Sequence, residues 1–183
     1  MNLLKHLPNM ISTIRLFLAP TILLLLTNAL ERWALILFII AGSSDLLDGY
    51  LARKYNLKTK LGSLLDPIAD KLLILLCVTF FVSQGDAPWW WFGIILLREV
   101  SLLVGVLLLK SFSVQIEIFP TWIGKVATAL NMFALVFLIA SSFKPLLVSP
   151  LINPLIVLAT LFTLTSFLQY TKKWFDLYRQ KGS

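Results

Sequence analysis

Long apolar stretches alternate with short polar connections along the chain. Hydrophobic residues dominate six stretches, at residues 10–28, 33–53, 61–83, 88–110, 121–143 and 148–171. A helix that crosses a bilayer needs about 20 mainly apolar residues, and each stretch is about that long. The pattern predicts an all-α integral membrane protein built as a bundle of six transmembrane helices. Residues 1–8, before the first stretch, are expected to form a short interfacial helix.

The connections between these stretches carry residues that favour turns. Thr27 and Asn28 end the first stretch, residues 83–88 join the third to the fourth, and residues 119–120 precede the fifth. Residues 145–154 hold three prolines and are interpreted as the last turn. No connection is long enough for an extramembrane domain, so residues 1–183 are interpreted as a single membrane domain.

Basic residues lie beside alternate connections. One side of the predicted bundle holds Lys5, Arg15, Arg53, Lys54, Lys58, Lys60, Lys110, Lys125, Lys172, Lys173, Arg179 and Lys181. The opposite side holds only Arg32 and Lys144, together with the aromatic run at residues 89–91, which is typical of a membrane interface. Because basic residues favour the cytoplasmic side, both termini are predicted to be cytoplasmic, as an even number of spans requires.

Composition supports a membrane location. Hydrophobic residues make up 58% of the 183 residues, whereas roughly 45–50% is usual for a soluble domain. The formal net charge is +7, but the basic residues sit at helix ends and not on a hydrophilic face. That placement favours anionic lipid headgroups and phosphate substrates as partners, and we expect no nucleic acid.

Four aspartates recur at helical spacing beside small residues. The first set is spaced at i, i+3, i+4 and i+7 and consists of Asp45, Asp48, Gly49 and Ala52. The second set is spaced at i, i+4 and i+8 and consists of Gly62, Asp66 and Asp70. Each set lines one face of its predicted helix, so two pairs of carboxylates are expected to meet in one cleft. The small residues leave room for a ligand to approach the backbone.

Carboxylates gathered in a membrane need compensation. A charged residue at the centre of a spanning helix costs about 2.5–3.5 kcal/mol, so lipid exposure of all four is excluded. Arg53 and Lys71 are candidates to neutralise two of them, which leaves two like charges facing each other. Oxygen-only ligands favour Mg²⁺ or Mn²⁺, and four carboxylates suit two ions. Such a site can polarise a phosphate or diphosphate, with Asp70 as the candidate base.

An ion-coupled transporter is the alternative function from another class of protein, because intramembrane acids also mark ion pathways.

The aspartate segment resembles the signature of the CDP-alcohol phosphatidyltransferase family, D-x2-D-G-x2-A-R-x8-G-x3-D-x3-D. Every fixed position of that signature is present between residues 45 and 70. The residues that the resemblance assigns to the metal ions are Asp45, Asp48, Asp66 and Asp70, the last of which doubles as the base. Those that it assigns to the CDP moiety are Asp45, Gly49, Ala52, Arg53, Gly62 and Asp66. It further implies attack by an alcohol on the β-phosphate of CDP-diacylglycerol, release of CMP, and a homodimer.

Two alcohols are candidates for the acceptor of the phosphatidyl group. Residues 8–15 and 120–126 look like their counterparts in phosphatidylglycerophosphate synthases and in the related cardiolipin synthases of this family. Residues 165–170 favour the former, which use glycerol 3-phosphate. In those enzymes another arginine commonly follows the pair Arg98-Glu99 by about two turns, where this chain has Val106. Transfer to glycerol 3-phosphate is the first prediction, and cardiolipin synthesis from phosphatidylglycerol is the second.

An anionic acceptor also follows from the position of Arg98. An arginine within an apolar helix is expected to face the bundle interior or a wet cavity. With Arg15 and Lys125 it is predicted to bind the acceptor phosphate, because guanidinium groups bind oxyanions through two parallel hydrogen bonds. Alternatively, Arg98 pairs with an aspartate of the motif, and Lys125 extends to the interface. Glu99 is expected to be a poor partner for Arg98, because adjacent helix positions do not face each other. We expect the site to face the cytoplasm at a bacterial inner membrane.

Overall fold

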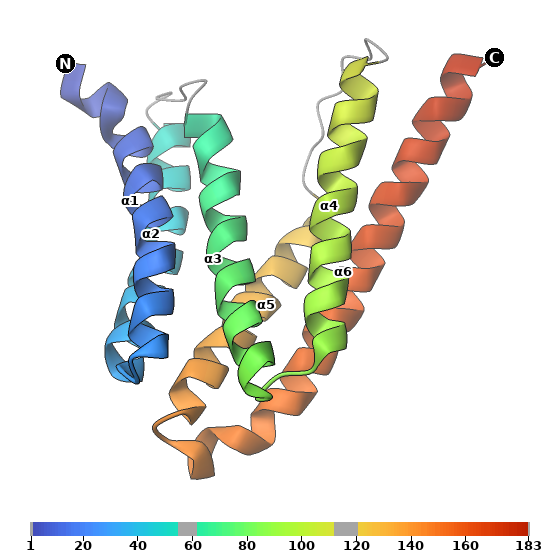
Figure 1. Cartoon of the computed structure of the whole chain (residues 1–183). Helices are drawn as coiled ribbons and strands as arrows, with labels where there is room; N and C mark the ends of the chain where they lie inside the picture. The colour runs from blue at the N-terminus through green and yellow to red at the C-terminus, as the bar shows by residue number, and fades with distance from the viewer. Residues whose placement is uncertain (1, 55–61, 112–120, 183) are drawn as a thin grey trace. The chain divides into compact units, whose positions relative to one another are not determined.

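The computed structural model describes residues 2–54, 62–111 and 121–182, with the side chains of residues 13–44, 68–105, 121–144 and 149–176 (Figure 1). All regular secondary structure in these residues is helical, and it forms α1 (Asn2–Thr27), α2 (Glu31–Lys54), α3 (Gly62–Gln84), α4 (Trp89–Ser111), α5 (Trp122–Ser141) and α6 (Pro145–Gly182). Each predicted apolar stretch coincides with one of these helices. The all-α fold class is therefore confirmed.

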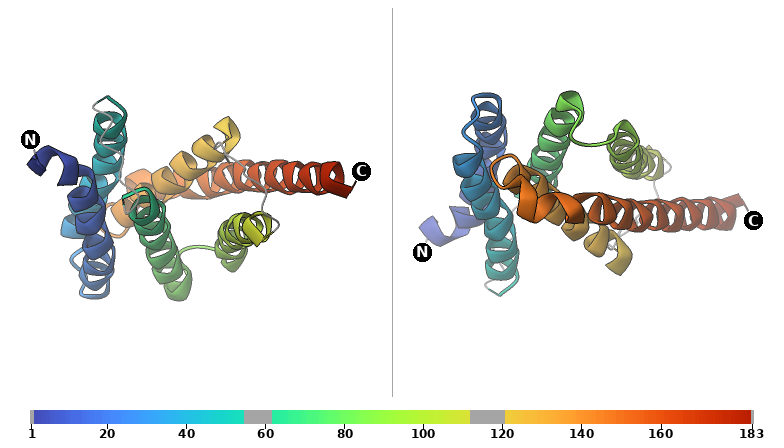
Figure 2. Two further views of the ribbon diagram at one scale, coloured as in Figure 1. Left: turned by 90° about the horizontal axis from the view of Figure 1, so that it is seen from above. Right: turned by 90° about the horizontal axis from the view of Figure 1, so that it is seen from below.

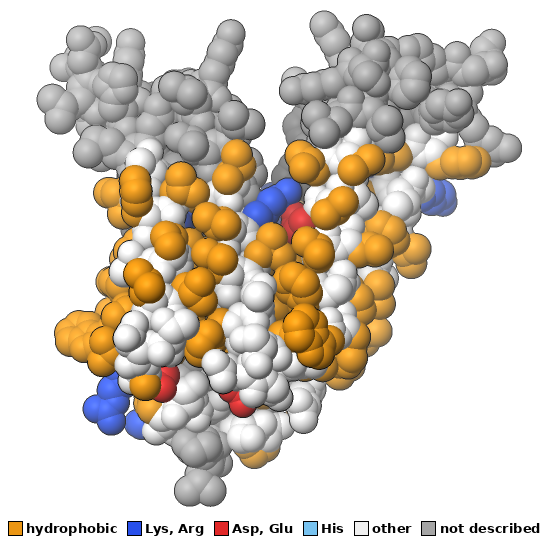
Figure 3. Space-filling view, in the orientation of Figure 1, with side chains coloured by type: hydrophobic (Ala, Val, Ile, Leu, Met, Phe, Trp, Pro, Cys, Tyr) orange, Lys and Arg blue, Asp and Glu red, His pale blue; other side chains and the backbone are white. Residues whose placement is uncertain are grey.

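Two of the described helical segments, Trp122–Ser141 and Ser149–Asp176, are long and apolar enough to cross a bilayer. Of the most apolar 18 residues in each, only 39% and 33% are buried, which is low for the core helix of a soluble protein. Hydrophobic side chains also cover much of the described surface in Figure 3. Large exposed apolar surfaces of this kind mark contact with lipid or a partner. These features agree with a helical membrane protein, and the six-span topology stays a prediction.

The helix boundaries differ from the predicted ones at two places. The short helix predicted over residues 1–8 is continuous with α1, which begins at Asn2, since leucine and lysine are good helix formers. The turn predicted over residues 145–154 is wrong, because α6 begins at Pro145 and the turn lies at residues 142–144. Proline is well suited to the first position of a helix, where its missing N–H would have no intrahelical partner.

The described residues form two compact units, which are treated separately. Unit 1 comprises residues 1–87 and 135–150 and contains α1, α2 and α3. In this unit α1 contacts both α2 and α3, and Figure 2 shows these helices from above and below. The buried residues of these three helices include several alanines, whose small side chains allow helices to approach closely: Ala19, Ile22, Ala34, Phe38, Ala69, Leu73 and Cys77.

Unit 2 comprises residues 88–134 and 151–183. A buried hydrogen-bond network joins its three helices. The indole Nε1–H of Trp91 donates to Asn131 Oδ1 at 2.9 Å, and Asn131 Nδ2 donates to Thr163 Oγ1 at 3.0 Å and to the Ala127 carbonyl at 2.9 Å. Trp91 is fully buried, whereas Trp89 and Trp90 are exposed. The prediction of an interfacial aromatic run is therefore wrong for Trp91, which packs inside unit 2.

Asn131→Ala should lower the free energy of unfolding by about 2 kcal/mol, because it leaves the indole N–H of Trp91 buried without its acceptor. Thermal unfolding in detergent micelles measures this loss. Asn28→Ala is the control, since the Asn28 side chain is exposed and donates to the Leu24 carbonyl four residues earlier in the chain. Equal losses in the two variants would contradict a bridging role for Asn131.

The helices α1 and α3 end in the same hydrogen-bond pattern with different residues at the left-handed position. Ala29 has a φ of 56° and Gly85 a φ of 84°. Leu30 N–H donates to the Leu25 carbonyl at 2.9 Å, as Asp86 N–H does to the Phe81 carbonyl at 2.9 Å. An alanine in this conformation is strained and a glycine is not.

This comparison predicts opposite effects of two substitutions. Ala29→Gly should stabilise the protein by about 1 kcal/mol, and Gly85→Ala should destabilise it by about the same amount. The melting temperatures of both variants in one detergent measure the difference. Gly93→Ala is the control, because Gly93 lies within α4 and an added Cβ there meets no atom within 4 Å. If Gly85→Ala were as stable as Gly93→Ala, the strain argument would be wrong.

Candidate functional site

The four aspartates lie on two helices of unit 1. Asp45 and Asp48 belong to α2, and Asp66 and Asp70 belong to α3. Their helical spacing is therefore confirmed at the level of the backbone. Only the Asp70 side chain is among those the structure describes, so the convergence of the four carboxylates stays a prediction. The side chains of Ala52 and Arg53 also lie outside the described residues, as do the surroundings of Gly49 and Gly62.

The helix bounds place three of the charged residues at a similar level in unit 1. Asp45 follows the start of α2 at Glu31 by about four helical turns, and Asp70 precedes the end of α3 at Gln84 by about four turns. Arg15 precedes the end of α1 at Thr27 by about three turns. These three helix ends lie toward the same end of unit 1 (Figure 1). At a rise of about 1.5 Å per residue, the three residues lie about 18–21 Å from that end.

Arg15 and Asp70 form an ion pair between α1 and α3. Arg15 Nη1 lies 2.6 Å from Asp70 Oδ1, and the Arg15 side chain is 1% exposed whereas that of Asp70 is 24% exposed. A charge-assisted contact this short is among the strong hydrogen bonds in proteins. The pair places a guanidinium group directly beside the predicted catalytic base. Sequence reasoning assigned Arg15 only to the acceptor phosphate and proposed Arg53 and Lys71 as the neutralising cations.

The signal for this contact is present in the helix register. Arg15 and Asp70 are separated by 55 residues in the chain, but they lie at similar distances from the ends of two helices joined through α2. Two helices separated by one antiparallel helix run in the same direction. Counting back from the predicted helix ends therefore brings Arg15 to the level of Asp70.

Arg98 lies in a second polar cluster, inside unit 2. It is 7% exposed, and its Nη1 is 3.0 Å from Glu99 Oε1, while its Nη2 donates to the Gly124 carbonyl at 3.1 Å. The expectation that Glu99 is a poor partner is wrong. The arginine side chain is long enough to bend around its own helix, and the partly buried carboxylate of Glu99 gains a cation. Arg98 thus ties α4 to the first turn of α5.

Gly124 is the point at which the polar groups of this cluster meet. A Cβ at this position would lie 3.1 Å from Thr121 Oγ1, 3.2 Å from Ser166 Oγ and 3.3 Å from Arg98 Nη2. Among the described residues, Ser166 Oγ and Arg98 Nε are buried without a hydrogen-bond partner. Buried polar atoms are nearly always hydrogen-bonded, so unsatisfied ones indicate a place for a ligand or water.

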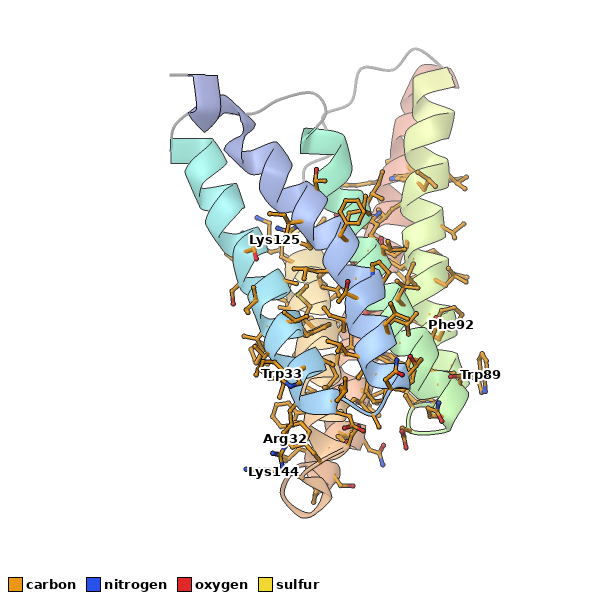
Figure 4. All side chains as sticks on the ribbon, turned by 60° about the vertical axis from the view of Figure 1, so that its left-hand side comes forward. Arg32, Trp33, Trp89, Phe92, Lys125 and Lys144 are labelled. Atoms are coloured by element: carbon orange, nitrogen blue, oxygen red, sulfur yellow. The ribbon has the colours of Figure 1, made fainter. Side chains whose placement is uncertain are left out.

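The third predicted phosphate contact, Lys125, has an exposed side chain at the start of α5 (Figure 4). Its Nζ lies 5.5 Å from the centre of the Trp122 ring, a cation–π distance. Arg98 contacts Gly124, the residue that precedes Lys125 in the chain. Arg15 belongs to unit 1, and Arg98 and Lys125 belong to unit 2.

The donor set of unit 1 fits a hard divalent cation. No group of three or more metal-ligating side chains occurs among those the structure describes, and three of the four aspartate side chains lie outside that set. The motif supplies carboxylate oxygens and no sulfur or imidazole, which is the donor set that Mg²⁺ and Mn²⁺ prefer. Asp45, Asp48, Asp66 and Asp70 are the residues that would hold such ions.

Comparisons with known proteins agree with these features. The family model described as CDP-alcohol phosphatidyltransferase matches residues 5–167. A Rickettsia typhi protein named CDP-diacylglycerol--glycerol-3-phosphate 3-phosphatidyltransferase is 38% identical over 144 residues, 76% of this chain and 79% of that protein. An Aquifex aeolicus protein with the same name is 31% identical over 176 residues, 94% of this chain and 97% of that protein. A Mycobacterium bovis protein named "Putative cardiolipin synthase" is 38% identical over 123 residues, 66% of this chain and 58% of that protein.

Proposed function

Since the chain belongs to the CDP-alcohol phosphatidyltransferase family, we propose that it transfers the phosphatidyl group of CDP-diacylglycerol to glycerol 3-phosphate. The acceptor hydroxyl attacks the β-phosphorus of the donor, and the bond from that phosphorus to the oxygen of CMP breaks. The hydroxyl proton passes to the Asp70 carboxylate. The products are phosphatidylglycerophosphate and CMP.

The ion pair of Arg15 and Asp70 is the observation that carries this proposal. It sets a cation at 2.6 Å from the base, so a phosphate held by Arg15 brings its own glycerol hydroxyl within reach of Asp70. An acceptor without an anionic group would gain nothing from this arrangement. Glycerol 3-phosphate carries both groups that the pair requires, a phosphate and nearby hydroxyls.

The donor, CDP-diacylglycerol, is assigned to the end of unit 1 at which α2 ends and α3 begins. Gly49, Ala52 and Arg53 lie in the last two turns of α2, and Gly62 is the first residue of α3. These residues seat the CDP moiety, with Asp45 and Asp66 beside it. Two Mg²⁺ or Mn²⁺ ions, when held by the four aspartates, supply positive charge against the diphosphate oxygens. The protein itself provides the four carboxylates, among them the base Asp70, and the Arg15 guanidinium group that orients the acceptor.

The membrane topology is part of the proposal. We assign six spans, cytoplasmic termini and a cytoplasmic site. In unit 1, Arg32 and Lys144 lie at the same end, where Arg32 is 5.9 Å from the centre of the Phe143 ring (Figure 4). This placement agrees with the charge distribution predicted by the positive-inside rule.

Arg98 and Ser166 are assigned to binding of the acceptor phosphate. The unsatisfied Nε of Arg98 and hydroxyl of Ser166 are available to a phosphate oxygen. Arg98→Ala should raise the KM for the acceptor about tenfold and leave the KM for CDP-diacylglycerol within about twofold, since one charge-assisted bond contributes about 1.5–3 kcal/mol. Steady-state kinetics with each substrate varied in turn measures both constants.

Two further variants separate binding from folding. Arg98→Lys keeps the positive charge and should recover part of the acceptor affinity. Arg32→Ala removes an exposed arginine from unit 1 and should change neither constant. An Arg98→Ala protein with a lower melting temperature but an unchanged acceptor KM would assign Arg98 a structural role only.

Cardiolipin synthesis from phosphatidylglycerol is the second candidate function. It is favoured by Val106, which replaces the additional arginine typical of enzymes that use glycerol 3-phosphate, and by the similarity to the mycobacterial protein. Purified protein supplied with CDP-diacylglycerol, Mg²⁺ and either acceptor distinguishes the two. Phosphatidylglycerophosphate formed from glycerol 3-phosphate supports the first function, whereas cardiolipin formed only from phosphatidylglycerol would replace it with the second. Solute flux without CMP release would favour the transporter alternative.

A further inference from the structure

A pocket lies in unit 2, lined by residues to which the proposed reaction assigns no role. It has a volume of about 420 Å³, between the start of α5 and the last described side chains of α6. The residues that line it include Thr121, Trp122, Gln169, Lys172, Lys173 and Asp176. Neither Arg98 nor Lys125 is among the lining residues. The two lysines give this pocket more positive than negative charge.

The residues around the pocket are typical of a membrane interface. The segment Ser149–Asp176 is long and apolar enough to cross a bilayer, and Lys172 and Lys173 are the first charged residues after Lys144 in the chain. Trp122, which lines the pocket, is 81% exposed. Tryptophan and lysine both favour the interface between hydrocarbon and water, so we expect the pocket to lie at that depth.

An exposed apolar stripe on α6 leads toward the lysines. Leu161, Leu168 and Phe175 are spaced by seven residues, so they lie on one face of the helix, and all three are more than half exposed. Leu168 and Lys172 are four residues apart and are therefore neighbours on the helix surface. A molecule that joins a phosphate to a long hydrocarbon chain matches this combination of pocket and stripe.

We propose that the pocket binds the headgroup phosphate of an anionic membrane phospholipid, whose acyl chain lies along the stripe on α6. Lys172 and Lys173 contact the phosphate, and Trp122 packs against the glycerol region. Basic pockets beside spanning helices bind anionic headgroups in this way. The pocket is built from residues of α5 and α6 and the residue before α5, whereas the four aspartates belong to α2 and α3. The proposal requires that α6 crosses the bilayer, but it does not require the transferase reaction.

The test is a binding measurement on the full chain in micelles of a neutral detergent. CDP-diacylglycerol is absent and EDTA is present, so the result is independent of the proposed activity. Phosphatidylserine is the probe, because it is the acceptor of neither candidate reaction. Native mass spectrometry follows the lipid retained as its concentration rises. We expect saturable retention of phosphatidylserine, no saturable retention of phosphatidylcholine, and no competition by inorganic phosphate at the same concentrations.

Charge variants locate the site. Lys172→Gln or Lys173→Gln should weaken the apparent affinity about fivefold, and both together about 30-fold, because each basic residue near a membrane surface contributes about 1 kcal/mol. Asp176→Asn should tighten binding, since it removes the acid that lines the pocket. The control is the pair Arg32→Gln with Lys144→Gln, which removes the same charge from two exposed positions in unit 1.

Three results would overturn the proposal. The first is an affinity for phosphatidylserine that the Lys172 and Lys173 variants leave unchanged. The second is an equal loss in the control pair, which would reduce the effect to net charge. The third is displacement of the lipid by inorganic phosphate, which would assign the pocket to a soluble anion.

Discussion

Asp70→Asn is expected to reduce the rate of CMP release by about 1,000-fold or more. General base catalysis contributes roughly 10²–10⁴-fold, and the amide cannot accept the proton of the attacking hydroxyl. The amide also has no charge for a divalent ion or for Arg15, whose Nη1 lies 2.6 Å from Asp70 Oδ1 in the wild-type protein. The rate with saturating CDP-diacylglycerol and glycerol 3-phosphate, measured as CMP formed per enzyme, tests this expectation.

Asp86→Asn is the matched control for this variant. Asp86 is exposed in the turn after α3, so its loss removes the same charge without touching the predicted site. Its activity should equal that of the wild type. The melting temperature of Asp70→Asn must also be recorded, because Arg15 is buried and loses its charged partner. A stable Asp70→Asn protein with more than about a tenth of the wild-type rate would rule out Asp70 as the base.

Arg15→Met should lower kcat/KM for glycerol 3-phosphate about 100-fold. The loss combines a charge-assisted contact to the acceptor phosphate, about 1.5–3 kcal/mol, with poorer positioning of Asp70. Methionine keeps an unbranched apolar side chain in a position that is 1% exposed, which limits the change in packing. We expect the acceptor KM to rise at least about tenfold and the KM for the donor to change little.

The division between kcat and KM distinguishes two roles for Arg15. If it only positions Asp70, kcat falls and the acceptor KM is unchanged, which contradicts the assignment of Arg15 to the acceptor phosphate. Arg15→Lys retains the charge but not the planar guanidinium group, and it should recover part of the acceptor affinity. Failure of lysine to improve on methionine would also count against phosphate binding.

The hydrophobic pattern was sufficient to predict the helices of this protein. Stretches of about 20 apolar residues coincide with α1 to α6 because burial or lipid contact of a whole helix requires an uninterrupted apolar sequence. The boundaries were less predictable where polar residues continue a helix. α6 extends to Gly182, beyond the apolar stretch that ends near residue 171, because lysine, arginine and glutamine are good helix formers in water.

The aspartate motif was also predictable, since its spacing depends only on residues within one helix or its neighbour. The ion pairs are predictable only in part. The helix ends place Arg15 and Asp70 at a similar level, but their contact across 55 residues also depends on how α1 packs beside α3. Arg98 was expected to avoid Glu99, because helix geometry describes where side chains leave the backbone and not how far an arginine can bend. Burial made the contact at 3.0 Å favourable.

CMP release from CDP-diacylglycerol and glycerol 3-phosphate, with and without divalent ions, tests the central claim most directly. Purified protein should be inactive in EDTA and should regain activity when Mg²⁺ or Mn²⁺ is added in excess, with one phosphatidylglycerophosphate formed per CMP. The same rate of CMP release in EDTA would contradict a site in which Asp45, Asp48, Asp66 and Asp70 act through metal ions.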